Sequence, residues 1–190
     1  GQGTTVSTTT TNLSSLSSYT AYDLYVAGNC GSGNTSVWVG PYSFVTPAQV
    51  GWIEPFNNGY DPTGAVIKPI EWTERNALAA NPTPAGTSTS AWMEDGYRNV
   101  GTTGAVRNNV PLTSNNTQGW TITPSLDLGN VAHTTFLEWD MAATLGSGTA
   151  AGIMGNDDTL FVLISTNNGT TWNRNQALAK YHRMSGISPT

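Results

Sequence analysis

The chain has 190 residues, of which only 10% are charged, with a net charge of −5 and an isoelectric point near 4.7. Its seven Lys and Arg residues are scattered along the sequence, which argues against nucleic-acid binding, because a phosphate backbone needs clustered cations. No apolar window of about 18 residues could span a bilayer, and no basic and apolar N-terminal segment resembles a signal peptide. We expect any export signal to have been removed or to lie outside this chain.

The composition favours β structure. Thr, Val, Trp and Tyr are abundant and pack well on a pleated surface, whereas the helix formers Lys, Glu, Gln and Arg are scarce. The sequence therefore predicts an all-β protein with a surface of Thr, Ser, Asn and Gly. Cys30 is the only cysteine, so an internal disulfide is excluded, and we expect it to be a small buried apolar residue.

Three strands are predicted in the first 47 residues, from alternation in "TTVSTTTTNLSSL", "AYDLYVAGNC" and "VWVGPYSFVTP". Tyr22, Leu24 and Val26 share one face of the second strand. The segment "LSSYTAYDLYVAGNCGSGNTSVWVGPYSFVTP", with its Cys-Gly-Ser-Gly turn, resembles the end of a fibronectin type III domain. The resemblance implies that Tyr22 is a tyrosine-corner residue, whose hydroxyl ties the preceding turn to the strand.

A complete sandwich of that type needs about seven strands in about 100 residues. Residues 1–47 are thus expected to be the C-terminal three strands of a fibronectin type III-like domain. Three strands cannot bury both inner faces of a sandwich. We expect the chain to come from a longer polypeptide, or another chain to complete this half-domain.

Residues 48–190 are predicted to form a second unit. Short strands separated by Gly, Asn and Pro turns favour a two-sheet sandwich or jelly roll. Ala177, Leu178 and Tyr181 have helical spacing and predict a helical turn or short helix in 175–184. The expected strands are 51–56, 69–77, 88–100, 120–128, 134–142 and 157–166, with long loops at 101–119 and 143–156.

Several loose motifs follow one another in this unit: Glu54 and Phe56, "W-x-I-x-P-x-L-x-L" from Trp120, "FLEWD" at 136–140, and the segment 157–172. In this order they resemble the cleaved-adhesin and MAM-like jelly-roll domains of Bacteroidota. The resemblance implies a secreted or surface-anchored protein exported by the type IX pathway. It also implies further strands after Thr190, so the jelly roll is expected to be incomplete at its C-terminus.

The segment "STNNGTTW" at 165–172 has three interpretations: the hairpin signature of a sialidase-type propeller, the rim of a metal or sugar site, or an ordinary turn between two strands. Ser165, Asn167, Gly169 and Trp172 match the outline of the sialidase Asp-box, but a propeller needs such units repeated about every 40–50 residues, and no second copy occurs. The simpler interpretation is a tight turn, with positive φ at Asn and Gly, that closes a hairpin between "LFVLIS" and "TTW". Trp172 would then pack onto the core.

Three acidic side chains are candidate metal ligands. Asp157 and Asp158 lie in a Gly/Asn loop, and hard oxygen ligands on a loop can hold Ca²⁺. Calcium often stabilises such loops in the resembled domains, and Glu54 is the most plausible third ligand there. The alternative is a solvated acidic turn. Asp158-Thr159-Leu160 also resembles the site at which Bacteroidota attach O-glycans, which makes Thr159 a candidate glycosylation site.

Tyr60, Trp92 and Tyr97 lie in loop-rich surroundings and could form a sugar-stacking platform, although aromatic residues of a sandwich more often anchor its core. No metal-spaced His cluster and no nucleophile elbow is present. The sequence therefore predicts a protein that is not an enzyme and has no cofactor other than structural calcium.

The function expected from these features is that of a non-catalytic adhesion or glycan- or protein-binding module of a large secreted or surface-anchored bacterial protein. Its partners would be glycans, surface proteins, or other domains and neighbouring chains, without nucleic acid and without membrane insertion. Two alternatives stay open. One is an accessory domain of a secreted peptidase or glycosidase, and the other is a structural repeat of a stalk or filament.

Overall fold

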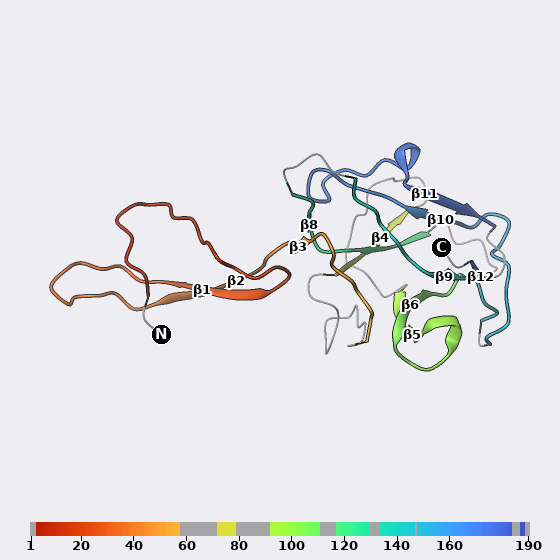
Figure 1. Ribbon diagram of the computed structural model, residues 1–190, viewed down its shortest axis with the longest axis horizontal. Helices are drawn as coiled ribbons and strands as arrows, with labels where there is room; N and C mark the ends of the chain where they lie inside the picture. The colour runs from red at the N-terminus through yellow and green to blue at the C-terminus, as the bar shows by residue number, and fades with distance from the viewer. Residues whose placement is uncertain are drawn as a thin grey trace.

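The computed structural model describes residues 3–57, 72–78, 92–110, 117–129, 134–146, 148–183 and 187–188. Regular structure in these segments is β strand apart from two three-residue 3₁₀ helices, so the prediction of an all-β protein is confirmed. Figure 1 shows that one hairpin projects from a rounded body that holds the other strands. The elements are β1 (Ala21–Val26), β2 (Val39–Val45), β3 (Ala48–Gln49), β4 (Thr73–Leu78), β5 (Trp92–Gly96), η1 (Tyr97–Asn99), β6 (Gly104–Asn108), β7 (Thr117–Ile122), β8 (Leu126–Asp127), β9 (Met141–Ala142), β10 (Thr159–Val162), η2 (Arg174–Gln176), β11 (Ala179–His182) and β12 (Ile187–Ser188).

Within the described segments the strands pair two by two. The ladders β1–β2, β4–β7, β5–β6, β9–β12 and β10–β11 are antiparallel, and β3–β8 is parallel. Small paired sheets of this kind are consistent with a β-sandwich. The fibronectin type III and jelly-roll topologies stay predictions.

The projecting hairpin β1–β2 has one apolar face. Its register places Tyr22 opposite Phe44 and Leu24 opposite Tyr42, and the rings of Tyr22 and Phe44 stack with centroids 5.7 Å apart. On the other face the Ser43 hydroxyl donates to Asp23 at 2.6 Å. Leu24 and Tyr42 lie exposed, so much of this apolar face is left uncovered by the described segments.

The hydrogen bond that the resemblance implies between the Tyr22 hydroxyl and the preceding turn is present. The phenol oxygen accepts a hydrogen bond from the Ser17 backbone N–H at 2.8 Å, and the Thr46 hydroxyl donates to the Ser17 carbonyl at 2.6 Å. These bonds hold the turn before β1 against the end of β2. The sequence therefore predicted this local contact correctly.

Two other expectations for this region are wrong. Residues 4–16 form no strand. The Thr8 hydroxyl donates to the Thr10 carbonyl instead, because Thr and Ser side chains can hydrogen-bond to nearby backbone groups in place of a neighbouring strand. Cys30 is exposed rather than buried. It begins a turn in which Gly31, Ser32 and Gly33 all have positive φ, and such a turn has no interior in which to bury a thiol.

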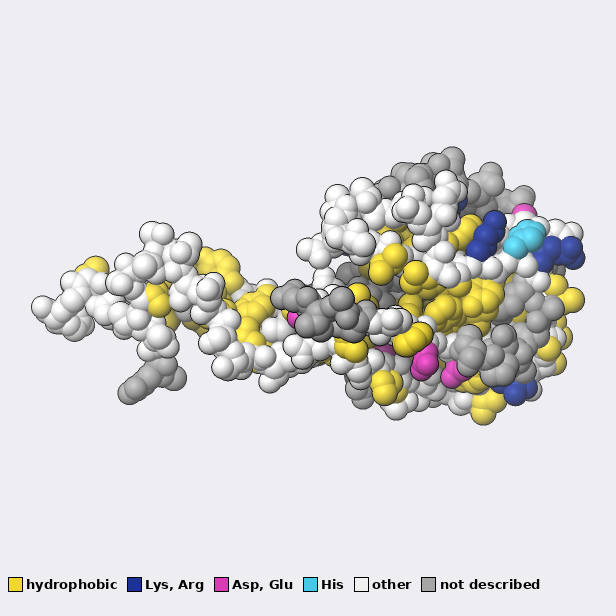
Figure 2. Space-filling model, turned by 45° about the horizontal axis from the view of Figure 1, so that its top comes forward, with side chains coloured by type: hydrophobic (Ala, Val, Ile, Leu, Met, Phe, Trp, Pro, Cys, Tyr) yellow, Lys and Arg dark blue, Asp and Glu magenta, His cyan; other side chains and the backbone are white. Residues whose placement is uncertain are grey.

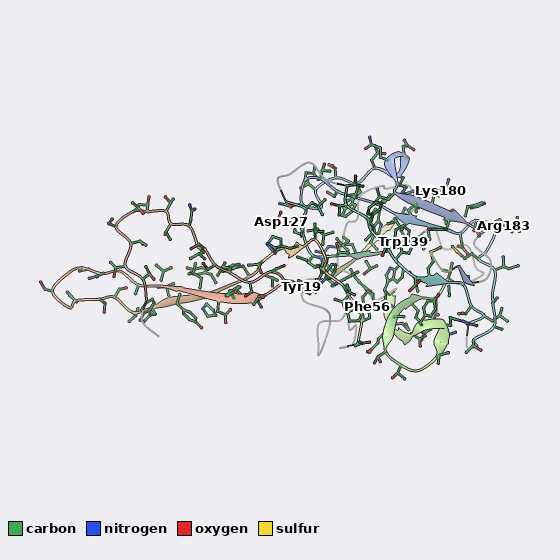
Figure 3. All side chains as sticks on the ribbon, viewed as in Figure 1. Tyr19, Phe56, Asp127, Trp139, Lys180 and Arg183 are labelled. Atoms are coloured by element: carbon green, nitrogen blue, oxygen red, sulfur yellow. The ribbon has the colours of Figure 1, made fainter. Side chains whose placement is uncertain are left out.

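A row of aromatic rings joins the hairpin to the body. Tyr19 meets Trp52 edge to face with ring centroids 5.2 Å apart, Trp52 lies 6.3 Å from Trp72, and Trp72 meets Phe56 at 5.2 Å. Trp72 is buried, and the fully buried Ala48 donates its N–H to Ser125 where β3 joins β8. Tyr19 and Phe56 lie at this junction in Figure 3.

The body departs from the sequence prediction in four segments. The expected strand at 51–56 is absent, since these residues form no regular element. The expected loop 101–119 contains β6, which pairs with β5, and the start of β7, which pairs with β4. Arg107 of β6 also forms a 2.9 Å ion pair with Asp95 of β5. The expected strand 134–142 is regular only at β9. The expected helix in 175–184 is confined to η2, which begins at Arg174, and residues 179–182 form β11.

Replacing Tyr22 with Phe should lower the free energy of unfolding by about 1 kcal/mol, because the Ser17 N–H loses its acceptor. Denaturant unfolding followed by fluorescence measures this change. The matched control is Tyr42→Phe on the same hairpin, whose exposed phenol should change stability by less than about 0.5 kcal/mol. Equal effects of the two substitutions would contradict the assigned tie.

Candidate functional site

The loop at 165–172 is held by its own side chains. The Ser165 hydroxyl donates to Asn167 Oδ1 at 2.8 Å and accepts from the Gly169 N–H at 2.9 Å. Asn167 Oδ1 also accepts from the Thr171 N–H at 3.0 Å, and its Nδ2 donates to Thr171 Oγ1 at 2.9 Å. Asn168 and Gly169 have the positive φ predicted for them. The loop is thus ordered by local polar contacts.

Trp172 fixes this loop to the body. Its indole N–H donates to the Gly169 carbonyl at 3.0 Å, and its ring lies 5.7 Å from the ring of Trp120 on β7. The predicted packing of Trp172 is therefore confirmed. The predicted hairpin partner is wrong: residues 170–172 form no strand, and β10 pairs with β11 instead. Asn173 caps η2 through Asn175, and that turn carries the chain onward to β11.

The candidate calcium ligands lie in two loops. Glu54 accepts from the Phe56 N–H at 2.9 Å, and Asp158 Oδ2 accepts from the Gly155 N–H at 2.8 Å. Asp157 is exposed beside Asp158. Within the described segments no three His, Cys, Asp or Glu side chains are grouped so that they could hold a metal. Calcium binding at these carboxylates stays a prediction.

The candidate sugar-stacking residues have structural contacts. Trp92 is half-buried on β5, and the Tyr97 hydroxyl donates to the Met141 carbonyl at 3.2 Å. Asn99, from the same turn as Tyr97, donates to the Gly148 carbonyl at 2.7 Å. These contacts favour the interpretation of Tyr97 as an anchor, and the half-buried position of Trp92 is consistent with the same interpretation. Tyr60 lies outside the described residues, so a ligand-binding role of the three stays a prediction.

Thr159, the candidate glycosylation site, lies half-buried on β10. Its Oγ1 is 3.1 Å from Nδ1 of the exposed His182, which is its partner on β11. A hydroxyl at a strand position with a hydrogen-bonding neighbour is less accessible than one in a loop. Its modification stays a prediction.

A group of cations on the same hairpin was missed by the sequence analysis. Lys180 Nζ lies 5.5 Å from the centroid of the Phe161 ring, and Arg174 Cζ lies 5.8 Å from it. Arg183 follows β11 directly. The description of the basic residues as scattered is therefore wrong for these three. The available signal was the absence of any acidic residue after Asp158.

Comparisons with protein-family models, curated proteins and solved structures found no match. The resemblances to adhesin and fibronectin type III domains thus depend on the motifs alone. Within the described segments, none of the helices has the length and apolar character needed to cross a membrane.

Replacing Asn167 with Ala should lower the free energy of unfolding by about 1–2 kcal/mol, because the Thr171 N–H and the Ser165 hydroxyl both lose an acceptor. Asn167→Asp is the matched control. It keeps the Oδ1 acceptor and has a second oxygen in place of the Nδ2 donor, to which the Thr171 hydroxyl can rotate to donate, so most of the stability should return. Thermal or urea unfolding measures both variants, and an Asp variant as unstable as the Ala variant would refute the role of Oδ1.

Proposed function

We propose that this chain is a non-catalytic binding module of a secreted or surface-anchored bacterial protein, with glycans or surface proteins as its partners. The observation that supports the proposal most is the exposure of large apolar side chains on a surface of uncharged polar residues. Val37, Ile53 and Phe136 are 82%, 79% and 80% exposed. On the β1–β2 hairpin such side chains adjoin one another, because the exposed Leu24 pairs with Tyr42 and the exposed Val26 with Val39. Contiguous exposed apolar side chains are typical of interaction surfaces.

Rigid loops also support a binding role. The loop at 165–172 is held by hydrogen bonds of Ser165 and Asn167 and by the packing of Trp172. A loop that is ordered before binding loses less conformational entropy when a ligand arrives. Its Thr and Asn side chains supply donors and acceptors without strong charge, which suits a hydroxyl-rich partner.

The stalk or filament alternative has its own supporting observation. The β1–β2 hairpin exposes Leu24 and Tyr42 on its apolar face, and an isolated two-stranded hairpin is marginally stable. A neighbouring chain laid on that face would stabilise it. Sedimentation velocity over a concentration series separates the two functions, because an adhesin module stays monomeric and a filament repeat associates.

The binding proposal is tested with a glycan array and a panel of surface proteins, probed with the chain in calcium and in a chelator. We expect saturable binding of at least one ligand, and mass spectrometry should show that ligand unchanged after prolonged incubation. A ligand converted to product, or no binding in either condition, would refute the proposal.

The same experiment tests calcium. If bound calcium orders the acidic loop, the chelator should weaken binding and lower the melting temperature, since a ligand of the native state stabilises it. Asp157→Asn and Asp158→Asn should then abolish the calcium response. Identical binding and melting with and without calcium would reject the calcium site while leaving the module function intact.

A further inference from the structure

Charge is distributed unevenly along this acidic chain. The 32 residues from Thr159 to Thr190 contain three of the seven Lys and Arg and none of the twelve Asp and Glu. They carry a charge of +3, so the preceding 158 residues carry −8. Such an asymmetry gives one part of the surface a potential opposite to that of the rest.

The β10–β11 register and the Phe161 ring bring Lys180 and Arg174 together on one face. Thr159 pairs with His182 and Phe161 with Lys180, and alternation places all four side chains on the same side of the ladder. The pairs Leu160–Tyr181 and Val162–Ala179 occupy the opposite side. We call Phe161, Arg174, Lys180 and His182, together with Arg183 just beyond the strand, the β10–β11 basic face. Arg183 has positive φ and lies outside the ladder, so it is included for its position next to His182 and not through strand alternation.

The cations of this face are accessible and are held in place. Lys180, His182 and Arg183 are exposed, whereas Arg174 and Phe161 are half-buried. Figure 2 shows Lys or Arg side chains on both sides of a His side chain at one end of the body, and Lys180 and Arg183 are labelled along β11 in Figure 3. The Phe161 ring attracts both Arg174 and Lys180 through cation–π contacts. This restricts the two side chains before any ligand binds.

Few acidic side chains neutralise the charge of the face. Lys180 and Arg183 form no ion pair within the described part of the chain. Asp157 and Asp158 precede β10, and Arg183 donates its backbone N–H to the Asp158 carbonyl at 3.3 Å. The Asp158 carboxylate accepts from Gly155 in its own loop. The Lys180 ammonium and the Arg183 guanidinium thus keep donors for an anion from solution.

We propose that the β10–β11 basic face binds an anionic polysaccharide through its carboxylate or sulfate groups. The three cations come from separate positions: Arg174 from η2, Lys180 from β11, and Arg183 from just beyond β11. Charges carried at separate points suit a ligand with several spaced anionic groups better than a single compact anion. The Thr159 hydroxyl and the His182 ring add hydrogen-bonding groups for sugar hydroxyls.

Nucleic acid fits this face less well. Duplex DNA carries one charge per about 1.7 Å of its axis, and the rest of this chain is strongly acidic. A handful of cations cannot offset the repulsion between so dense a polyanion and a surface of charge −8. A polymer with one charge per sugar experiences less of that repulsion.

The proposal rests on the proposed binding function, because it names the ligand class and the face that would serve it. Binding is measured for the full chain with alginate as a carboxylated glycan, κ-carrageenan as a sulfated one, dextran as the neutral control and duplex DNA as the dense polyanion. The intact mass of the chain is measured first, to check that Thr159 carries no glycan that would cover the face. We expect alginate or κ-carrageenan to bind at about 0.05 M salt and to be largely released at about 0.5 M, while dextran stays unbound.

The double variant Arg174→Gln/Lys180→Gln should weaken binding about tenfold, since two charge contacts are lost. Arg98→Gln is the matched control: it removes one exposed cation from η1, outside the face, and should change affinity by less than about twofold. Phe161→Leu should weaken binding severalfold while all cations remain, because the ring no longer orders them. If the double variant does not fold, Arg183→Gln on the exposed end of the face replaces it.

Three outcomes would overturn the inference: equal loss in the Arg98 variant, DNA binding as tight as that of the glycans, or no binding of either anionic glycan. Binding of neutral glycans or surface proteins that the double variant retains would also overturn it, yet would leave the proposed binding function standing. If the chain binds no ligand on the array, both the basic-face inference and the proposed binding function are refuted.

Discussion

The row of rings from Tyr19 through Trp52 and Trp72 to Phe56 is the contact on which the arrangement of the molecule depends. It joins a projecting hairpin, which has little apolar cover of its own, to a body made of short paired strands. Aromatic pairs of this geometry contribute about 0.5–1.5 kcal/mol each beyond their buried area. The buried Ala48 and the β3–β8 ladder continue the same junction into the body.

Away from the junction, local polar contacts order two of the loops that connect the paired strands. The Tyr22 phenol fixes the turn before β1, and the Ser165 and Asn167 side chains fix the loop after β10. Because these bonds close within a few residues, they leave the outer faces of the strands open. That combination of fixed loops and open faces underlies both the binding proposal and the basic face on β10 and β11.

Local patterns predicted local structure well. Alternation placed Tyr22 and Leu24 on one face of a strand, and the Asn-Gly pair predicted positive φ at Asn168 and Gly169. Pairing over longer distances was not predictable in the same way. The composition of Gly104–Asn108 predicts a loop, but the segment forms strand β6. Its Arg107 forms an ion pair with Asp95 of the neighbouring strand β5. Such a contact has no signature within a single segment.

The candidate site shows the same limit. The sequence indicated the turn at Asn167 and the packing of Trp172, but it gave β10 the wrong partner. Lys180 and Phe161 are 19 positions apart in the sequence, and no sequence pattern indicates that their side chains are neighbours. Their place on one face follows from the ladder, and the charge asymmetry alone could only have suggested that a basic surface exists.

Hydrogen exchange of the Trp52→Ala variant tests the role of the junction most directly. The account predicts that the Tyr19 and Ala48 amides, which donate to Pro47 and Ser125, exchange about tenfold faster than in the unmodified chain. Trp38→Ala, which removes an exposed ring from the loop before β2, should leave them unchanged. Equal exchange at Tyr19 and Ala48 in both variants would contradict the account.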